Sequence, residues 1–108
     1  MTAKTPHKPT LLLVDDQVIN IHLLQHIFKD DYNILAATTG AQALELSASQ
    51  VPDLILLDVV MPVMDGHQVC SHLKADPRTR DIPVIFVTGH NNPEDETAAL
   101  RLGAVDFI

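Results

Sequence analysis

The sequence predicts an α/β fold, a doubly wound, parallel, five-stranded sheet with helices on both faces. Short runs that are apolar throughout alternate along the chain with longer stretches in which apolar residues recur at helical spacing. Runs without polar positions are expected where helices cover both sides of a sheet, which is the environment of parallel strands. Strands that alternate with helices in this way favour one sheet with right-handed crossovers.

Five runs have the length and composition of buried strands. They lie at 11–14, 34–37, 54–57, 84–87 and 104–108. Asp106 interrupts the last run, whose apolar character is therefore incomplete. Each run is expected to supply one strand to the sheet.

The stretches between these runs predict four helices. They lie at 18–28, 40–49, 66–74 and 94–102. Thr39 and Gln42 are spaced for a capping box at the start of the second helix, and Asp65 and Gln68 have the same spacing before the third. Local start signals therefore support the helical periodicity.

Length and composition fit one folded domain. The chain has 108 residues, of which 46% are hydrophobic and 19% charged, so one core is feasible. Pro6, Pro9 and the lack of periodicity predict a disordered lead-in at 1–9, followed by one domain at 10–108. We find no internal repeat and no second domain.

Charge and cysteine usage exclude several classes of function. A net charge of −7, with Lys and Arg scattered, argues against binding to nucleic acid. No apolar run approaches the roughly 20 residues that span a bilayer, and the N-terminus lacks the apolar segment of a signal peptide. The lone Cys70 cannot form an internal disulfide. A cytoplasmic protein that is not embedded in a membrane is expected.

Polar residues follow three of the predicted strands. Asp15 and Asp16 follow the first strand, Asp58 follows the third, and Thr88 and Gly89 follow the fourth. Ligands of open α/β sheets bind outside the carboxyl ends of the strands, where the strand order reverses. Carboxylates that meet at this edge repel one another, and a divalent cation with hard oxygen ligands, most simply Mg²⁺, would relieve the repulsion.

These residue types support phosphoryl transfer to a carboxylate. Asp58 is the candidate nucleophile, because a carboxylate beside a metal ion can attack a phosphoryl donor and become an acyl phosphate. The hydroxyl of Thr88 can donate a hydrogen bond to a phosphate oxygen, and Gly89 lets the backbone come close to it. Other uses stay open, since Asp15 and Asp16 can also end a strand and cap the following helix.

The motifs together resemble the receiver domain of response regulators, the CheY-like superfamily. The resemblance rests on Leu-Leu-Val-Asp-Asp at 12–16, Asn20, Leu-Leu-Asp-Val-Val-Met-Pro-Val-Met-Asp-Gly at 56–66, Ile-Pro-Val-Ile-Phe-Val-Thr at 82–88 and Leu-Gly-Ala-Val-Asp-Phe at 102–107. It covers nearly everything after Pro9. The resemblance implies a flavodoxin-like sheet with strand order 2-1-3-4-5.

The resemblance also assigns roles at the metal and phosphorylation site. Asp58 is implied as the phosphoacceptor and a metal ligand, and Asp16 as a direct Mg²⁺ ligand. Asp15 is implied to act largely through metal-bound water, and the backbone carbonyl of Val60 to complete the protein ligands. The implied donor is a phosphohistidine on a sensor histidine kinase or a phosphotransfer protein. The domain would catalyse only its own phosphorylation and is not otherwise an enzyme.

Further roles concern the readout of phosphorylation. Thr88 is implied as the switch hydroxyl, with Gly89 beside the phosphate, and Phe107 as the aromatic switch. Phosphorylation is implied to remodel the surface at 94–107 and so to control a homodimer, a partner or a C-terminal effector domain. The segment 76–81 and the ending at 102–107 look similar to receivers joined to cyclic-di-GMP turnover domains.

One departure from the family pattern carries an expectation of its own. The family has a lysine just after the fifth strand and then a fifth helix, and this chain stops at Ile108, before both. The fifth helix is therefore absent from this chain, whose domain is expected to be C-terminally incomplete. We expect the 108-residue chain to expose apolar surface on its first helix and fifth strand, and to self-associate or be marginally stable.

Two other functions compete with the phosphoacceptor. A pseudo-receiver would act only as a binding or dimerisation surface, which the missing lysine allows and the intact acids oppose. A phosphatase of the haloacid dehalogenase type also uses an aspartyl nucleophile, but it needs an acid two residues later, where this chain has Val60. Nucleotide-binding glycine motifs do not occur.

Overall fold

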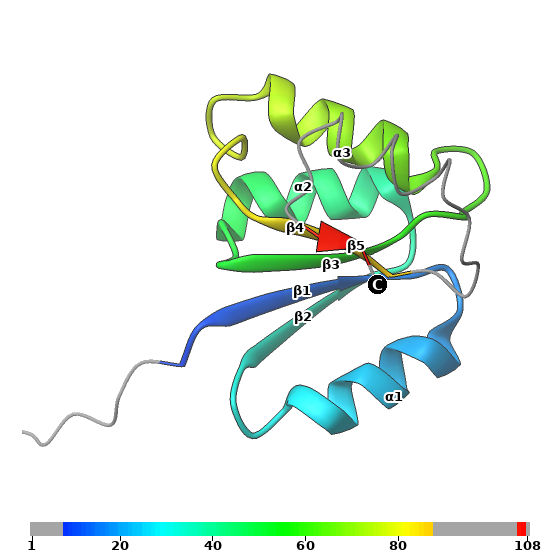
Figure 1. Cartoon of the computed structure of the whole chain (residues 1–108), viewed down its shortest axis with the longest axis vertical. Coiled ribbons are helices and arrows are strands. Elements are labelled where there is room, and N and C mark those ends of the chain that lie inside the picture. The colour runs from blue at the N-terminus through cyan, green and yellow to red at the C-terminus, as the bar shows by residue number, and fades with distance from the viewer. Residues whose placement is uncertain (1–7, 88–105, 108) are drawn as a thin grey trace, which may run out of the picture.

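The computed structural model describes residues 8–87 and 106–107 of the chain, the last two as backbone (Figure 1). In chain order the elements are β1 (Thr10–Val14), α1 (Val18–Phe28), β2 (Asn33–Ala37), α2 (Gly40–Gln50), β3 (Leu54–Asp58), α3 (Gly66–Ala75), β4 (Val84–Val87) and β5 (Asp106–Phe107). The predicted helix at 94–102 lies outside the described residues. The other elements agree with the sequence to within one residue at each end, except for β5, where the described part is two residues long.

The strands form one parallel sheet with the predicted strand order. The order is β2-β1-β3-β4-β5, so the chain reverses its direction of travel across the sheet between β1 and β3. Val14 is paired with Leu57, and Asp58 with Val87. The β1–α1 and β3–α3 connections consequently leave the sheet at the same edge, on the right in Figure 1.

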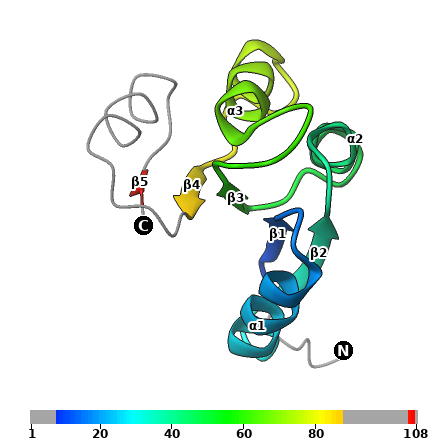
Figure 2. The same cartoon turned by 90° about the vertical axis from the view of Figure 1, so that its right-hand side faces the viewer.

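Helices cover both faces of the sheet, as Figure 2 shows, with α1 on one face and α2 and α3 on the other. Within each strand, alternate side chains enter different cores. Leu12 and Val14 of β1 pack toward α2 and α3, whereas Leu11 and Leu13 pack toward α1. This two-sided burial is why β1 is apolar at every position from Leu11 to Val14.

The helix starts show which capping signals are purely local. Before α3, Asp65 Oδ1 accepts a hydrogen bond from Gln68 N at 2.9 Å, and Gln68 Oε1 accepts one from Asp65 N at 3.0 Å, which completes the predicted capping box. Before α2, Thr39 Oγ1 accepts from Gln42 N at 3.1 Å. Gln42 Oε1, however, accepts from Thr38 N at 3.0 Å, so the second half of that box is shifted by one residue from the prediction.

The outer face of α1 is apolar and exposed. Four of its large side chains are between 54% and 63% accessible: Val18, Ile19, Leu23 and Ile27. This exposure agrees with the expectation that the first helix presents apolar surface. The same expectation for the fifth strand stays a prediction, because the side chains of β5 lie outside the described residues. None of the helices in the described ranges combines the length and apolar character that crossing a bilayer requires.

Candidate functional site

Three carboxylates meet at the edge of the sheet that the sequence indicated. Each of Asp15, Asp16 and Asp58 offers an oxygen, and these oxygens all lie within 4.8 Å of one another. Asp15 and Asp16 follow β1, and Asp58 is the last residue of β3. Because Val14 is paired with Leu57, the next residues of the two strands reach the edge at the same level. The parallel register therefore assembles the cluster.

The three acids differ in how they are bonded. Asp15 is only 8% exposed, and its Oδ1 accepts a hydrogen bond from Gln17 N at 2.9 Å. Gln17 is the N-cap of α1 and makes no side-chain capping bond, so Asp15 orders the start of this helix in its place. Asp58 is half-buried, and its Oδ1 accepts a longer bond of 3.3 Å from Val60 N. Asp15 is therefore not the N-cap residue of α1, and its bond to the N–H of Gln17 accompanies its membership of the cluster.

Electrostatics single out Asp58. Burial raises its pKa from the ordinary 3.8 to about 6, and the negative charge of Asp15 and, less strongly, of Asp16 acts in the same direction. Hydrogen bonds from the backbone of Val60 and Val59 act in the opposite direction, since they favour the ionised carboxylate. A cation binds favourably where negative charges are crowded together and only partly compensated.

Gly66 holds the Asp58 end of β3 against the start of α3, a role that the sequence did not reveal. Its N–H donates to Val59 O at 2.8 Å. A Cβ at this position would overlap the backbone carbonyl of Asp58 and lie 2.9 Å from Val59 Cα. In the sequence, Asp65 and Gly66 predict only a helix start, and no local signal shows how close this backbone approach is.

Other predicted site residues are described in part or not at all. Val60 is 60% exposed, and its N–H donates to Asp58 Oδ1 at 3.3 Å, which places its backbone beside the cluster. Thr88 and Gly89 lie outside the described residues, as does the side chain of Phe107. Val87, the residue before Thr88, is paired with Asp58 across β3 and β4.

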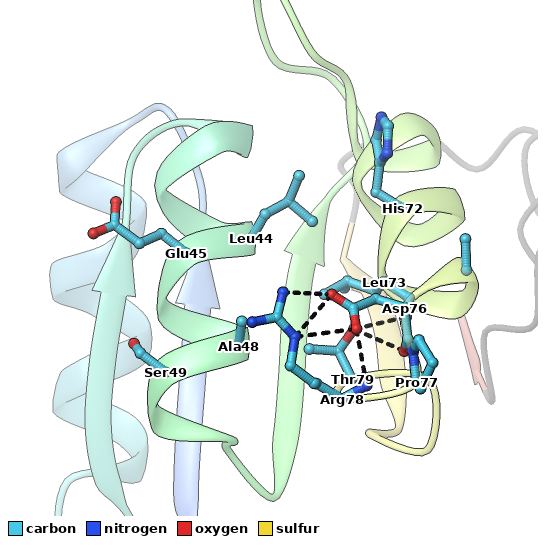
Figure 3. A pocket seen from close by; sticks show the side chains of 11 residues that line it. Leu44, Glu45, Ala48, Ser49, His72, Leu73, Asp76, Pro77, Arg78 and Thr79 are labelled. Carbon is cyan, nitrogen blue, oxygen red and sulfur yellow. Dashed lines mark hydrogen bonds and ion pairs between the residues drawn. The ribbon is translucent and has the colours of Figure 1, made fainter.

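A large hollow lies elsewhere, between α2 and α3 (Figure 3). It has a volume of about 790 Å³ and is lined by the C-terminal halves of both helices and by the turn that follows α3. Arg78 Nη2 donates to Asp76 Oδ2 at 2.9 Å on its wall, and Thr79 Oγ1 donates to Leu73 O at 2.7 Å below it. Its wall is therefore tied together by bonds within the chain, and none of the three clustered acids lines it.

Comparison with known families identifies the family to which the chain belongs. Residues 11–108 match the family described as the response regulator receiver domain. The chain belongs to this family, and it is a phosphoacceptor receiver domain of two-component signalling.

Individual relatives agree with this assignment. A probable cyclic di-GMP phosphodiesterase of Vibrio cholerae is 48% identical over 99 residues, which are 92% of this chain and 22% of that protein. The response regulator PleD of Caulobacter vibrioides is 43% identical over 99 residues, which are 91% of this chain and 22% of PleD. The chain thus spans less than a quarter of the length of either relative.

A solved structure has the same fold. The chemotaxis protein CheY4 of Vibrio cholerae superposes with a TM-score of 0.89 at 25% sequence identity. The match covers 94% of this chain and 86% of the CheY4 chain. The flavodoxin-like arrangement implied by the motifs is therefore confirmed.

Proposed function

We propose that Asp58 is the residue of this receiver domain that accepts the phosphoryl group. The observation that carries the proposal is the convergence of three carboxylates from β1 and β3 within 4.8 Å of one another. Among them, Asp15 is less suited to attack a donor, because it is buried and its carboxylate accepts a short hydrogen bond from Gln17. Asp58 is only half-buried, and its Oδ1 accepts a longer hydrogen bond, from Val60 N at 3.3 Å.

The proposal includes Mg²⁺ as the cofactor. Asp15, Asp16, Asp58 and the backbone carbonyl of Val60 would hold it. The fit rests on hard oxygen donors, which Mg²⁺ prefers, and on the closeness of the three carboxylates. Burial and, next, the charge of Asp15 raise the pKa of Asp58, so its ionised form needs a compensating charge. A bound Mg²⁺ would neutralise charge on the transferring phosphoryl group.

The proposed donor is a phosphohistidine on a sensor histidine kinase or a phosphotransfer protein. A carboxylate oxygen of Asp58 forms the new O–P bond while the P–N bond of the donor breaks, and the leaving imidazole takes up a proton. Asp58 must be ionised for this, and a pKa of about 6 leaves most of the carboxylate ionised at neutral pH. We infer a cytoplasmic location, because the ATP that charges such a kinase is found there.

Readout of the phosphate is assigned to three residues beyond the described acids. The proposed roles are a switch hydroxyl for Thr88, a close backbone approach for Gly89 and an aromatic switch for Phe107. Support comes from the register, because Thr88 directly follows the residue that is paired with Asp58. The remodelled surface would control a homodimer, a partner or an effector domain.

For the output, we favour an effector domain of cyclic-di-GMP turnover. Support comes from the relative at 48% identity, which is named a probable cyclic di-GMP phosphodiesterase. The test is the cyclic-di-GMP content of cells that express the natural gene with and without Asp58→Asn. An unchanged content would refute this output.

Labelling by a small phosphodonor tests the site itself. The chain is incubated with radiolabelled acetyl phosphate, with Mg²⁺ or with excess chelator, and acid-stable and base-labile label is measured. We expect Mg²⁺-dependent labelling that Asp58→Asn abolishes, whereas the exposed Asp81→Asn, outside the cluster, labels normally. Labelling that survives in Asp58→Asn would disprove the assignment, and an unlabelled parent chain would favour the pseudo-receiver.

A further inference from the structure

Two histidines share one side of α1, outside the acid cluster. His22 and His26 are four residues apart in a regular helix, and both are exposed. Because four residues advance a helix by slightly more than one turn, the two side chains differ by only about 40° around the axis, and their Cβ atoms are about 5–6 Å apart. Both imidazole rings can therefore reach one point in the solvent beside the helix.

A small hollow on the surface of α1 is bordered by both rings. It has a volume of about 210 Å³ and is lined by His22, Gln25, His26 and Lys29. Within the described residues, neither imidazole has a hydrogen-bond or ion-pair partner. In Figure 2, α1 covers one face of the sheet while α2 and α3 cover the other, so neither of those helices lies over the hollow. The ring nitrogens are thus available to bind a ligand.

The charge around the pair favours a cation. His26 lies in the last turn of α1, where the partial negative charge at the end of a helix stabilises positive charge. The chain has a net charge of −7, and Asp30 and Asp31 follow the helix directly. Lys29, the C-cap, opposes a cation, but its side chain is exposed and flexible enough to turn away.

The histidines of α3 show why the spacing matters. His67 and His72 are five residues apart, so their side chains point about 140° away from each other around the axis. His67 is partly buried, with its ring packed edge-on against Phe86 at a centroid distance of 5.3 Å, whereas His72 is exposed. These two rings cannot share an ion. The spacing, and not the number of histidines, distinguishes α1.

We propose that His22 and His26 together bind one divalent transition-metal ion, such as Zn²⁺, at a site separate from the acid cluster. Neutral imidazole is a preferred ligand of Zn²⁺, with Zn–N bonds of about 2.0–2.1 Å, whereas Mg²⁺ prefers hard oxygen ligands. Water completes the coordination of the ion. The chain then has two metal sites of different chemistry, and the second joins two successive turns of α1.

Calorimetric titration of the whole chain with Zn²⁺ tests the site, with Mg²⁺ in excess to compete for the carboxylates. We expect saturable binding to the unaltered chain. His22→Gln and His26→Gln should each weaken it about tenfold or more, because a second ligand that is linked to the first adds at least that much affinity. His72→Gln is the matched control, since His72 is exposed on another helix, and it should leave the affinity unchanged.

Moving one histidine separates its position from its mere presence. The double change Gln25→His and His26→Gln keeps two histidines three residues apart, on the same side of α1, and should restore most of the affinity that His26→Gln loses. The double change His26→Gln and Ile27→His keeps the number of histidines at a spacing of five, and should restore none of it. All of these positions are exposed, so the fold should tolerate the changes.

Three results would overturn the inference. They are an unaltered chain that does not bind Zn²⁺, full affinity in His26→Gln, and equal affinity in the two double variants. The site does not depend on the phosphoacceptor, so Asp58→Asn should bind Zn²⁺ as the unaltered chain does. Loss of binding in Asp58→Asn would put the ion at the acid cluster and refute a separate site.

Discussion

Replacing Asp58 by asparagine should stabilise the domain, and the gain should depend on pH. The folded protein raises the pKa of this carboxyl from 3.8 to about 6 through burial and the charges of Asp15 and Asp16. Between these two pH values the folded state binds more protons than the unfolded state. The stability that this carboxyl contributes to the parent chain is therefore fully present below about pH 3.8. It is lost as the pH rises through about 6.

The size of the effect follows from the shift. If the whole rise in the pKa of Asp58 from 3.8 to about 6 affected stability, the free energy of unfolding would change by about 3 kcal/mol. Because Asp58 is only half-buried, solvent screens much of the repulsion, and about 1 kcal/mol is a realistic expectation. Asn is nearly the same size and carries no charge. Asp58→Asn should therefore raise the melting temperature by about 4–8 °C at pH 7.5 and have little effect at pH 3.5.

Thermal and urea unfolding of both proteins from pH 3.5 to 8, with chelator present, measures this difference. Asp81→Asn is the control, because Asp81 is exposed and outside the acid cluster, so its effect should be small at every pH. Adding Mg²⁺ should stabilise the parent chain and shrink the advantage of Asp58→Asn, since binding to the folded state adds stability. An Asp58→Asn protein that is less stable at pH 7.5, or a difference that does not vary with pH, would refute the electrostatic reasoning.

Three further changes test other parts of the structure. Gly66→Ala should cost about 2 kcal/mol or more and lower acetyl phosphate labelling, because its Cβ meets backbone at Asp58. A Cβ at Gly40 would meet only side-chain atoms, of Met64 and Val69 at 2.9 Å, so Gly40→Ala should be milder in both assays. Similar effects of the two substitutions would contradict this reading. Lys74→Met should cost about 1–3 kcal/mol in urea unfolding with labelling unchanged, because Nζ donates to the carbonyls of Arg80 and Ile82 at 3.0 and 2.8 Å. Neutral stability would show that these bonds are not formed in solution. The double change Leu23→Gln and Ile27→Gln should make the chain more monomeric in sedimentation experiments, since both side chains are exposed apolar groups on α1, and unaltered association would place the contact elsewhere.

Some features of the site follow from local sequence alone. Apolar runs and helical periodicity predict the order of elements, because burial on two faces removes polar residues from a strand and burial on one face spaces apolar residues along a helix. The capping box of Asp65 and Gln68 is equally local, since both partners lie within one turn. The identity of the three acids also came from sequence, because parallel strands joined by helical crossovers bring their carboxyl ends to one edge.

Contacts between distant segments decided the rest. The sequence shows Asp58 as a strand-ending acid, but its raised pKa depends on the burial and neighbouring charges that the β1–β3 register creates. It shows Gly66 as a helix start, but the need for glycine comes from the backbone of β3 pressing against it. It shows Val63 as one more apolar residue, and only the folded loop gives it a positive φ and full exposure. Periodicity and capping act within a few residues and can be read from the chain, whereas distances, solvation and strain arise when separate segments pack, and those quantities determine how this domain can accept a phosphoryl group.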